Sequence, residues 1–368
     1  MEKQHQRVLA LDAFRGLTVA AMILVNNPGS WGHIYSPLEH APWNGCTPTD
    51  LVFPFFLFIV GVSMWFSFIK YNHKLSVESS KKILKRMFII FLIGLILHAF
   101  PFYNLHPEKM RIMGVLQRIA LVFGFGAFIC LGIKETYHKY IGTLILLGYW
   151  IALTLWGGSD PYNLETNLVR SVDIAVLGIN HLWTGAGLPF DPEGLLSTLP
   201  AIVTVMLGYH TGKLIERNKM EQALNILFVR GLLCVLAGMI WNMAMPINKA
   251  LWTSSYVLYT AGLAMCVLAI ALWLVDVMGR KKLIGPFVEY GSNALFVFAA
   301  SGLLVKTLSL ITVTVDEKRL SLTGYFYQKI YELIGNAELS SLLYAVTWVI
   351  FLWVIAHILY RKHIFIKI

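Results

Sequence analysis

Apolar runs long enough to cross a lipid bilayer recur along the whole chain. About ten such segments can be delimited in the 368 residues, each close to the length that the hydrocarbon core of a membrane requires. They are residues 8–28, 51–70, 86–103, 112–133, 139–157, 194–213, 224–245, 252–277, 283–308 and 340–360. Only 14% of the residues are charged, which excludes soluble enzyme folds, DNA-binding modules and disordered scaffolds. The sequence predicts an all-α, polytopic integral membrane protein, a helical bundle that forms one transmembrane domain over residues 1–368.

The basic residues give this bundle an orientation. Most of the 30 Lys and Arg residues fall in connections that share one side when both chain ends are placed in the cytoplasm. Cytoplasmic loops of membrane proteins are rich in Lys and Arg, so this placement is favoured, and no nucleic-acid partner is expected. Long segments at about 28–50, 158–193 and 309–339 then lie on the extracytoplasmic side. The stretch GYFYQKIYELI in the last of them is typical of an interfacial amphipathic helix.

Arginines also occur inside the predicted spans, where a charge is costly enough to suggest a function. Arg230 lies near the predicted cytoplasmic end of its helix and is interpreted as snorkelling to the interface. Arg118 lies deeper, and an interhelical pair with a buried carboxylate or carbonyl is the alternative to a functional role. Arg15 shares a helix face with Asn26, but it is also placed to be neutralised by Asp12.

Ordered sequence blocks point to a known family. They are LDAFRGLTVAAMILVNN, EHAPWNGCTPTDLVFPFFLFIVG, RIMGVLQRIAL, DPEGLLSTLPAIVTVMLGYHTGK, PINKALWTSSYVL and PFVEYGSNALFVF. In this order they resemble the heparan-alpha-glucosaminide N-acetyltransferase family and its bacterial relatives. The resemblance implies a transferase of the acyltransferase class that takes acetyl from cytoplasmic acetyl-CoA. The acetyl group is passed to the amino group of a glucosamine on the other side of the membrane.

The same resemblance implies two catalytic residues. The catalytic histidine precedes the WNG motif, which makes it His40, and its partner asparagine at the end of the first shared helix is Asn26. Acyl transfer to an amine needs a base and a donor to the tetrahedral oxyanion. An imidazole titrates near neutral pH and suits the first role, whereas an amide can donate to the oxyanion or orient the imidazole. Residues 27–30 replace a glycine-rich stretch of the relatives, so the acceptor mouth is expected to differ in shape. Heparan itself is not assumed as the acceptor, and a cell-wall or scavenged amino sugar is an alternative.

Other polar residues are candidates for binding. Those expected on the extracytoplasmic side near the amino sugar are Trp43, Asn44, Asp50, Glu193, Asn248 and Lys249. Asp50 opens a helix and equally suits an N-cap, and Trp43 equally suits a membrane-interface anchor. Contacts to anionic CoA are assigned to Arg15, Arg118 and Gln117, although no glycine-rich loop marks a nucleotide site. The four cysteines have no paired spacing, so no metal is predicted.

Two other classes of function stay open. An amino-sugar transporter, or permease, also suits about ten helices, but broken helices and repeat symmetry are expected of a carrier. The third class is a non-catalytic anchoring subunit. The expected surroundings are the lipid bilayer, at the cell inner (cytoplasmic) membrane, and an amino-sugar acceptor. The oligomeric state is open, a homodimer included.

Overall fold

Helices make up almost all of the described chain, as its apolar runs predict. The computed structural model describes residues 8–315 and 318–366, and the chain ends, which are predicted to lie in the cytoplasm, fall outside this part. The fold consists of two compact units. The first takes its residues from Met1–Glu39, Met220–Asn225 and Cys266–Lys367, and the second from His40–Lys219 and Ile226–Met265.

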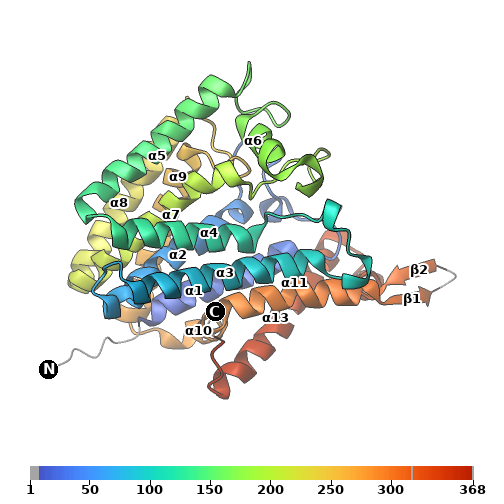
Figure 1. Ribbon diagram of the computed structural model, residues 1–368. Helices are drawn as coiled ribbons and strands as arrows, with labels where there is room; N and C mark the ends of the chain where they lie inside the picture. Colours follow the sequence, from blue (N-terminus) through green and yellow to red (C-terminus); the bar gives the residue numbers. More distant parts are fainter. Residues whose placement is uncertain (1–7, 316–317, 367–368) are drawn as a thin grey trace. The chain divides into compact units, whose positions relative to one another are not determined.

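The first unit joins helices to a short hairpin. Its helices are α1 (Leu9–Asn26), α10 (Gly285–Ser292), α11 (Ala294–Leu310), α12 (Leu322–Ile334) and α13 (Ala337–Arg361) (Figure 1). The strands β1 (Thr312–Val315) and β2 (Lys318–Ser321) pair antiparallel between α11 and α12. The GYFYQKIYELI stretch forms most of α12, so a helix is present where the sequence predicts one. The hairpin is not predicted, because four-residue strands are too short for an alternating pattern to stand out.

α1 and α10 approach one another through a pair of glycines. A Cβ added at Gly16 would lie 1.7 Å from the Phe287 carbonyl oxygen, and one at Gly291 would lie 2.0 Å from that of Asp12. Small residues let helix backbones come this close in membrane proteins. Arg15 donates to Asp12 Oδ1 and to the Gly291 carbonyl oxygen, both at 3.2 Å. The neutralising pair that the sequence suggests for Arg15 is therefore present, and it also ties α1 to α10.

A sharp bend separates α10 from α11. The two helices are bent by 83° at Asn293, and together they are apolar enough to form one broken span. The Asn293 side chain donates to the Ile364 carbonyl oxygen at 3.0 Å and accepts from the Ile366 backbone at 2.8 Å. Asn293, at the break, thereby fixes the position of the segment that follows α13.

The second unit is built around α2 and α7. It contains α2 (Pro48–Phe68), α3 (Val77–Ala99), α4 (Val115–Gly132), α5 (Glu135–Trp156), α6 (Leu168–Leu177) and α7 (Leu195–Arg217), with most of α8 (Met220–Trp241) and α9 (Ser254–Leu272). A Cβ at Gly61 of α2 would lie 2.1 Å from the Val205 carbonyl oxygen of α7. One at Gly208 of α7 would lie 2.0 Å from that of Phe58. These glycines bring the two helices together and so fix the positions of their first turns.

Short elements complete the fold. 3-10 helices lie at Ser36–Leu38, Ile69–Tyr71, Phe102–Asn104, Pro107–Lys109, Ile179–His181 and Lys281–Ile284, and a π-helical turn lies at Trp273–Val277. The predicted loop 158–193 therefore holds α6 and a 3-10 turn.

The predicted all-α polytopic fold is confirmed. Among the described residues, eight helices are long and apolar enough to span a membrane, and α10 with α11 would make a ninth. The span predicted at 86–103 corresponds to α3, which already begins at Val77. Its first half carries Lys81, Lys82, Lys85 and Arg86. The apolar part of α3 is therefore shorter than the sequence pattern suggests.

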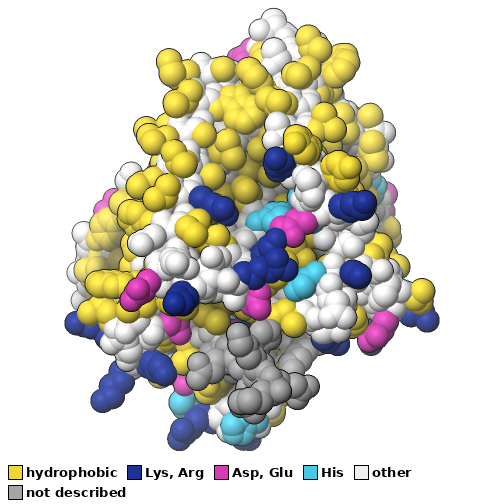
Figure 2. Space-filling model, turned by 90° about the vertical axis from the view of Figure 1, so that its left-hand side faces the viewer, with side chains coloured by type: hydrophobic (Ala, Val, Ile, Leu, Met, Phe, Trp, Pro, Cys, Tyr) yellow, Lys and Arg dark blue, Asp and Glu magenta, His cyan; other side chains and the backbone are white. Residues whose placement is uncertain are grey.

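Charged and histidine side chains meet where α5 begins and α7 ends. Lys213 pairs with Glu135, and a ring nitrogen of His138 lies 3.2 Å from one of His210. Figure 2 faces this end of the two helices and shows Lys, Arg, Asp, Glu and His side chains gathered near the middle of the face. Hydrophobic side chains cover much of its upper part.

Candidate functional site

A carboxylate at the first turn of α2 orients a histidine. His40 Nδ1 lies 2.7 Å from Asp50 Oδ1, and Asp50 Oδ2 accepts from the backbone amides of Ala41 and Thr47, each at 3.0 Å. The sequence suggests Asp50 as the N-cap of this helix, but the N-cap is Thr47, and Asp50 is the N3 member of a capping box with it, because α2 already begins at Pro48. An ionised carboxylate only accepts hydrogen bonds, so the hydrogen of the neutral imidazole is on Nδ1 and Nε2 carries the lone pair.

The two members of this pair differ in exposure. The Asp50 side chain is 2% exposed and that of His40 is 46% exposed. The buried carboxylate is therefore held on one side of the ring, while the exposed imidazole is open to a reactant. This is the arrangement of a base whose tautomer and direction are set by a second group.

Lys249, from the connection between α8 and α9, lies against the same pair. Its Nζ is 3.1 Å from His40 Nδ1 and 3.5 Å from Asp50 Oδ1. Burial lowers the pKa of the Lys249 ammonium, and the Asp50 carboxylate opposes this shift. A positive charge is thus placed beside the imidazole, at a point where it can act on a developing negative charge.

A pair of asparagines joins the two loops of the site. Asn248 is fully buried, and its Nδ2 donates to Asn44 Oδ1 at 3.1 Å. Its Oδ1 accepts from the Leu251 backbone at 2.8 Å, and Gly45 donates to the Ile247 carbonyl oxygen at 2.7 Å. These contacts keep the residues around Lys249 next to the WNG loop, so Asn248 has a clear positioning role.

Trp43 is also engaged in packing. Its indole donates to the Tyr162 carbonyl oxygen at 2.7 Å, and its ring meets Phe190 edge-on with centroids 5.5 Å apart. It packs against a buried cluster that includes Leu153 and Val169. The tryptophan therefore anchors the WNG loop to the segment 158–193.

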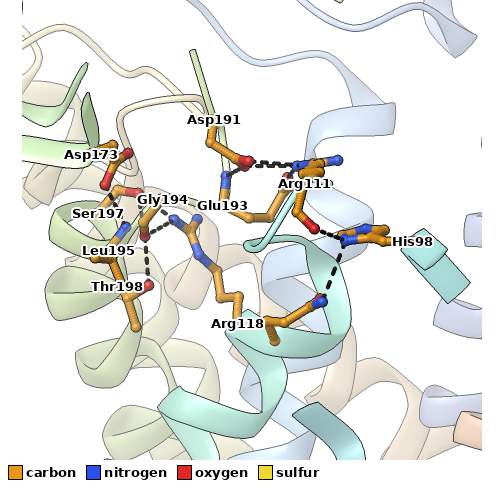
Figure 3. Close-up of polar contacts among 11 residues, drawn as sticks. His98, Arg111, Arg118, Asp173, Asp191, Glu193, Gly194, Leu195, Ser197 and Thr198 are labelled. Carbon is orange, nitrogen blue, oxygen red and sulfur yellow. Dashed lines mark hydrogen bonds and ion pairs between the residues drawn. The ribbon is translucent and has the colours of Figure 1, made fainter. Parts of the chain in front are cut away.

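A second polar cluster lies ahead of α7. Arg111 holds Asp191 with a two-pronged ion pair at 2.7 and 2.8 Å, and it reaches Glu193 at 2.7 Å (Figure 3). Burial raises the pKa of Asp191 against the pull of Arg111. At Glu193, burial is outweighed by the cations of Arg111, Arg118 and Lys249, which lower the pKa of its carboxyl. The Glu193 carboxyl is therefore ionised near neutral pH.

The start of α7 is fixed by two buried side chains. Arg118 is fully buried, and it donates to the Gly194 carbonyl oxygen at 3.2 Å and to the Ser197 hydroxyl (Figure 3). Its guanidinium also lies 5.1 Å from the centroid of the Trp252 ring. The carbonyl pairing that the sequence offers as an alternative for Arg118 is therefore present. Gln117, next to it, is 1% exposed and lies beside His98.

Asp173 supplies the other contact to α7. Its Oδ1 accepts from the Leu195 backbone at 2.8 Å, and a Cβ at Gly194 would lie 1.8 Å from its Oδ2. Glycine is needed at position 194 because the carboxylate occupies the space of a side chain. Burial raises the pKa of Asp173 to about 7.

Sequence reasoning assigned no role to Arg111 and missed Asp173. The acidic stretch DPEG is visible in the sequence, but the pairing of its Asp191 and Glu193 with Arg111 depends on the tertiary fold. Asp173 lies in a short helix with no motif around it. Arg15 and Asn26 belong to the first unit; Arg15 is paired with Asp12, and Asn26 is exposed at the end of α1.

Comparison with known proteins gives the chain's relatives. The family model described as heparan-alpha-glucosaminide N-acetyltransferase, catalytic, matches residues 7–239. The chain is 28% identical over 421 residues to the heparan-alpha-glucosaminide N-acetyltransferase of Mus musculus and 28% identical over 427 residues to that of Homo sapiens. Each alignment covers 98% of this chain and 60% of the relative. The chain therefore spans about three fifths of the length of these curated relatives.

Proposed function

Because the chain belongs to the heparan-alpha-glucosaminide N-acetyltransferase catalytic family, we propose that it is a transmembrane acetyltransferase. It moves acetyl from cytoplasmic acetyl-CoA to the amino group of a glucosamine-type sugar on the extracytoplasmic side of the inner membrane. The observation that carries this proposal is the 2.7 Å contact between exposed His40 and buried Asp50. A general base oriented in this way is what transfer to an amine requires.

His40 acts on the attacking amine. An amino sugar is protonated near neutral pH, and its nitrogen attacks only after losing that proton. That first proton goes to solvent. As the neutral amine nitrogen bonds to the thioester carbonyl carbon, Nε2 of His40 accepts the second proton of that nitrogen, and the carbon–sulfur bond breaks. The proton then passes to the CoA thiolate that leaves. Asp50 steadies the imidazolium formed in between, because the negative carboxylate lies against Nδ1.

Other residues act on the intermediate and on the acceptor. Lys249 places a cation where the oxygen of the tetrahedral intermediate becomes negative. Asn26 is a further amide donor on the strength of the family resemblance alone. Glu193 is ionised, and its side chain is 13% exposed, which suits the ammonium of an incoming sugar. Trp43, Asn44 and Asn248 hold the loops that carry these groups.

The cosubstrate is acetyl-CoA, and its anionic part is assigned to the basic side of the protein. Arg15 keeps its proposed contact to CoA. Gln117 does not, because it is 1% exposed beside His98, at the end of α4 away from the predicted basic side. Arg118 contributes indirectly, since its guanidinium is buried and holds the start of α7. Partners beyond the sugar and the lipid bilayer are not required by this scheme.

An amino-sugar transporter is the second candidate. It is favoured by one observation, the 83° bend between α10 and α11, because broken helices are common at carrier binding sites. A histidine–carboxylate pair can also serve as the proton relay of a coupled carrier, so it is the family match that favours the enzyme.

One experiment separates these functions. The protein is reconstituted into vesicles with glucosamine inside and acetyl-labelled acetyl-CoA outside. Free CoA outside and N-acetylated sugar inside support the transmembrane enzyme. Release of unmodified glucosamine through the protein supports the transporter, and neither product supports an anchoring subunit. Product that forms only when both substrates are on the same side contradicts transfer across the membrane.

A further inference from the structure

A pocket of about 310 Å³ lies in the second unit, between α7, α8 and α9. Its wall is mostly apolar and includes Leu207, Leu227 and Leu233; polar groups come from His210, Thr211 and Arg230. His210 lies about 22 Å further along α7 than Leu195, by the rise of an α-helix. The pocket is therefore separate from the cluster at the start of α7, and no residue of the proposed reaction lines it.

Arg230 is the charged group of this pocket. α8 begins at Met220, earlier than the sequence pattern indicates, so Arg230 lies about 15 Å beyond the helix start and about 7 Å beyond Asn225. This distance from the helix start is larger than the sequence pattern indicates, and the Arg230 side chain is exposed. Within the described residues, no ion pair or hydrogen bond of the Arg230 side chain is present. A guanidinium at this depth favours an anionic partner.

The outer surface of α8 beside the pocket is apolar, as a lipid-facing surface is. The neighbours Val229 and Leu233 are 56% and 59% exposed, and only 22% of the apolar window of α8 is buried. Exposed apolar side chains on a spanning helix are covered by acyl chains. An anion that reaches Arg230 along this surface must itself be at home in the bilayer, which a water-soluble anion is not.

We infer that this pocket binds an anionic phospholipid from the surrounding leaflet. The lipid phosphate pairs with Arg230, near the depth at which lipid headgroups meet the hydrocarbon core. One acyl chain lies along the wall formed by Leu207, Leu227 and Leu233. The volume is at the lower end for small-molecule pockets, as expected for part of one chain. His210 and Thr211 supply hydrogen-bonding groups to the headgroup side.

The His138–His210 contact limits what His210 offers to the lipid. His138 Nε2 lies 3.0 Å from the Ile133 carbonyl oxygen and therefore donates to it. Its Nδ1 then accepts from His210 Nε2 at 3.2 Å. In the neutral pair, His210 Nδ1 is consequently an acceptor, which suits a headgroup hydroxyl. Phosphatidylglycerol carries both a phosphate and hydroxyls and is the probe of choice.

Native mass spectrometry of the purified full chain tests this inference. The protein is titrated with phosphatidylglycerol and with phosphatidylcholine of identical acyl chains. We expect a saturable phosphatidylglycerol adduct and weaker phosphatidylcholine binding. Arg230→Gln should weaken the phosphatidylglycerol adduct roughly fivefold, the effect of one basic residue at a membrane surface. Arg361→Gln removes an exposed arginine at the end of α13 and should leave the adduct unchanged.

A second variant keeps the charge and fills the space. Cys234 lines the pocket, so Cys234→Trp should reduce the adduct while Arg230 is intact. Equal binding of the two lipids by the wild-type protein overturns the inference without any variant. Unchanged phosphatidylglycerol binding in both pocket variants does so as well. Displacement of the lipid by added acetyl-CoA would assign the pocket to the cosubstrate instead.

Discussion

His40 and Asp50 are the residues on which the proposed chemistry depends most. Substitution His40→Ala should lower turnover by at least about 10²-fold, the low end for general acid–base catalysis, because no other base is oriented by Asp50. Acetyl-CoA binding and detergent melting should change little, since the helix-capping contacts of Asp50 remain. His33→Ala is the matched control, because His33 lies in the same loop and is exposed. Near wild-type turnover in His40→Ala would remove this residue from the mechanism.

The charge of Lys249 should set how kcat/KM falls at alkaline pH. Burial lowers the pKa of its ammonium, so the cation is lost at a lower pH than for an ordinary lysine. In Lys249→Arg the charge persists, and the alkaline fall of kcat/KM should move to higher pH. Lys249→Met should lower kcat at pH values below the alkaline fall, where the wild-type lysine is charged. An alkaline limb that is identical in wild type and Lys249→Arg would assign that limb to another group.

Asp173 should make stability depend on pH. Its pKa is raised to about 7 in the folded protein, against about 4 for a free aspartate. The unfolded chain therefore loses this proton first, and the stabilising contribution, complete below pH about 4, is lost as the pH rises toward 7. Asp173→Asn should flatten this part of the curve. Melting temperatures in detergent from pH 4 to 8 test this, and parallel curves would contradict it.

The site was only partly predictable at this scale. His40, Asp50 and Lys249 carry chemistry that can be recognised in the sequence, and the structure brings them together. Asp173 could not be recognised, because its importance comes from the space left by Gly194 and from the free amide of Leu195. Such roles depend on which carboxylate the tertiary fold brings to which helix start, and the local sequence does not indicate this.

Among the elements, α2 and α7 approach too closely for an added side chain at their glycines. Gly61→Ala places a methyl group 2.1 Å from the Val205 carbonyl oxygen, so one backbone must move. We expect a loss of about 1–3 kcal/mol of stability, typical of overpacking, and a lower melting temperature in detergent. Gly148→Ala in α5 is the control, because a Cβ there meets nothing within 4 Å. Equal melting temperatures for the two variants would show that the α2 and α7 backbones can move apart without loss of stability.

Long apolar helices were predictable because their length must match the bilayer. Helix boundaries set by polar residues were not, as the early start of α3 at Val77 illustrates. Its basic first half joins a serine cap to an apolar second half, and hydropathy detects only the latter. The hairpin β1–β2 and the short α6 were missed because neither needs to match the membrane.

For the molecule as a whole, sidedness is the decisive prediction. In a background lacking the native cysteines, Ser36→Cys should react with an impermeant thiol reagent on intact cells. Lys134→Cys should react only after permeabilisation, because residue 134 is predicted to be cytoplasmic. Both positions are exposed, so labelling reports the side of the membrane and not burial. The reverse pattern would place His40 on the side of acetyl-CoA and make transfer across the membrane unnecessary.

The two oxygens of Asp50 also limit how such a protein can be redesigned. One oxygen begins α2 through the amides of Ala41 and Thr47, and the other directs His40. Glutamate would displace the carboxylate by a methylene, and asparagine would turn a donor toward one of the two partners. Neither of these conservative substitutions at position 50 is therefore expected to leave both contacts intact. New acceptor specificity has to be sought at other side chains, such as Glu193, whose carboxylate pairs with Arg111 and does not begin a helix.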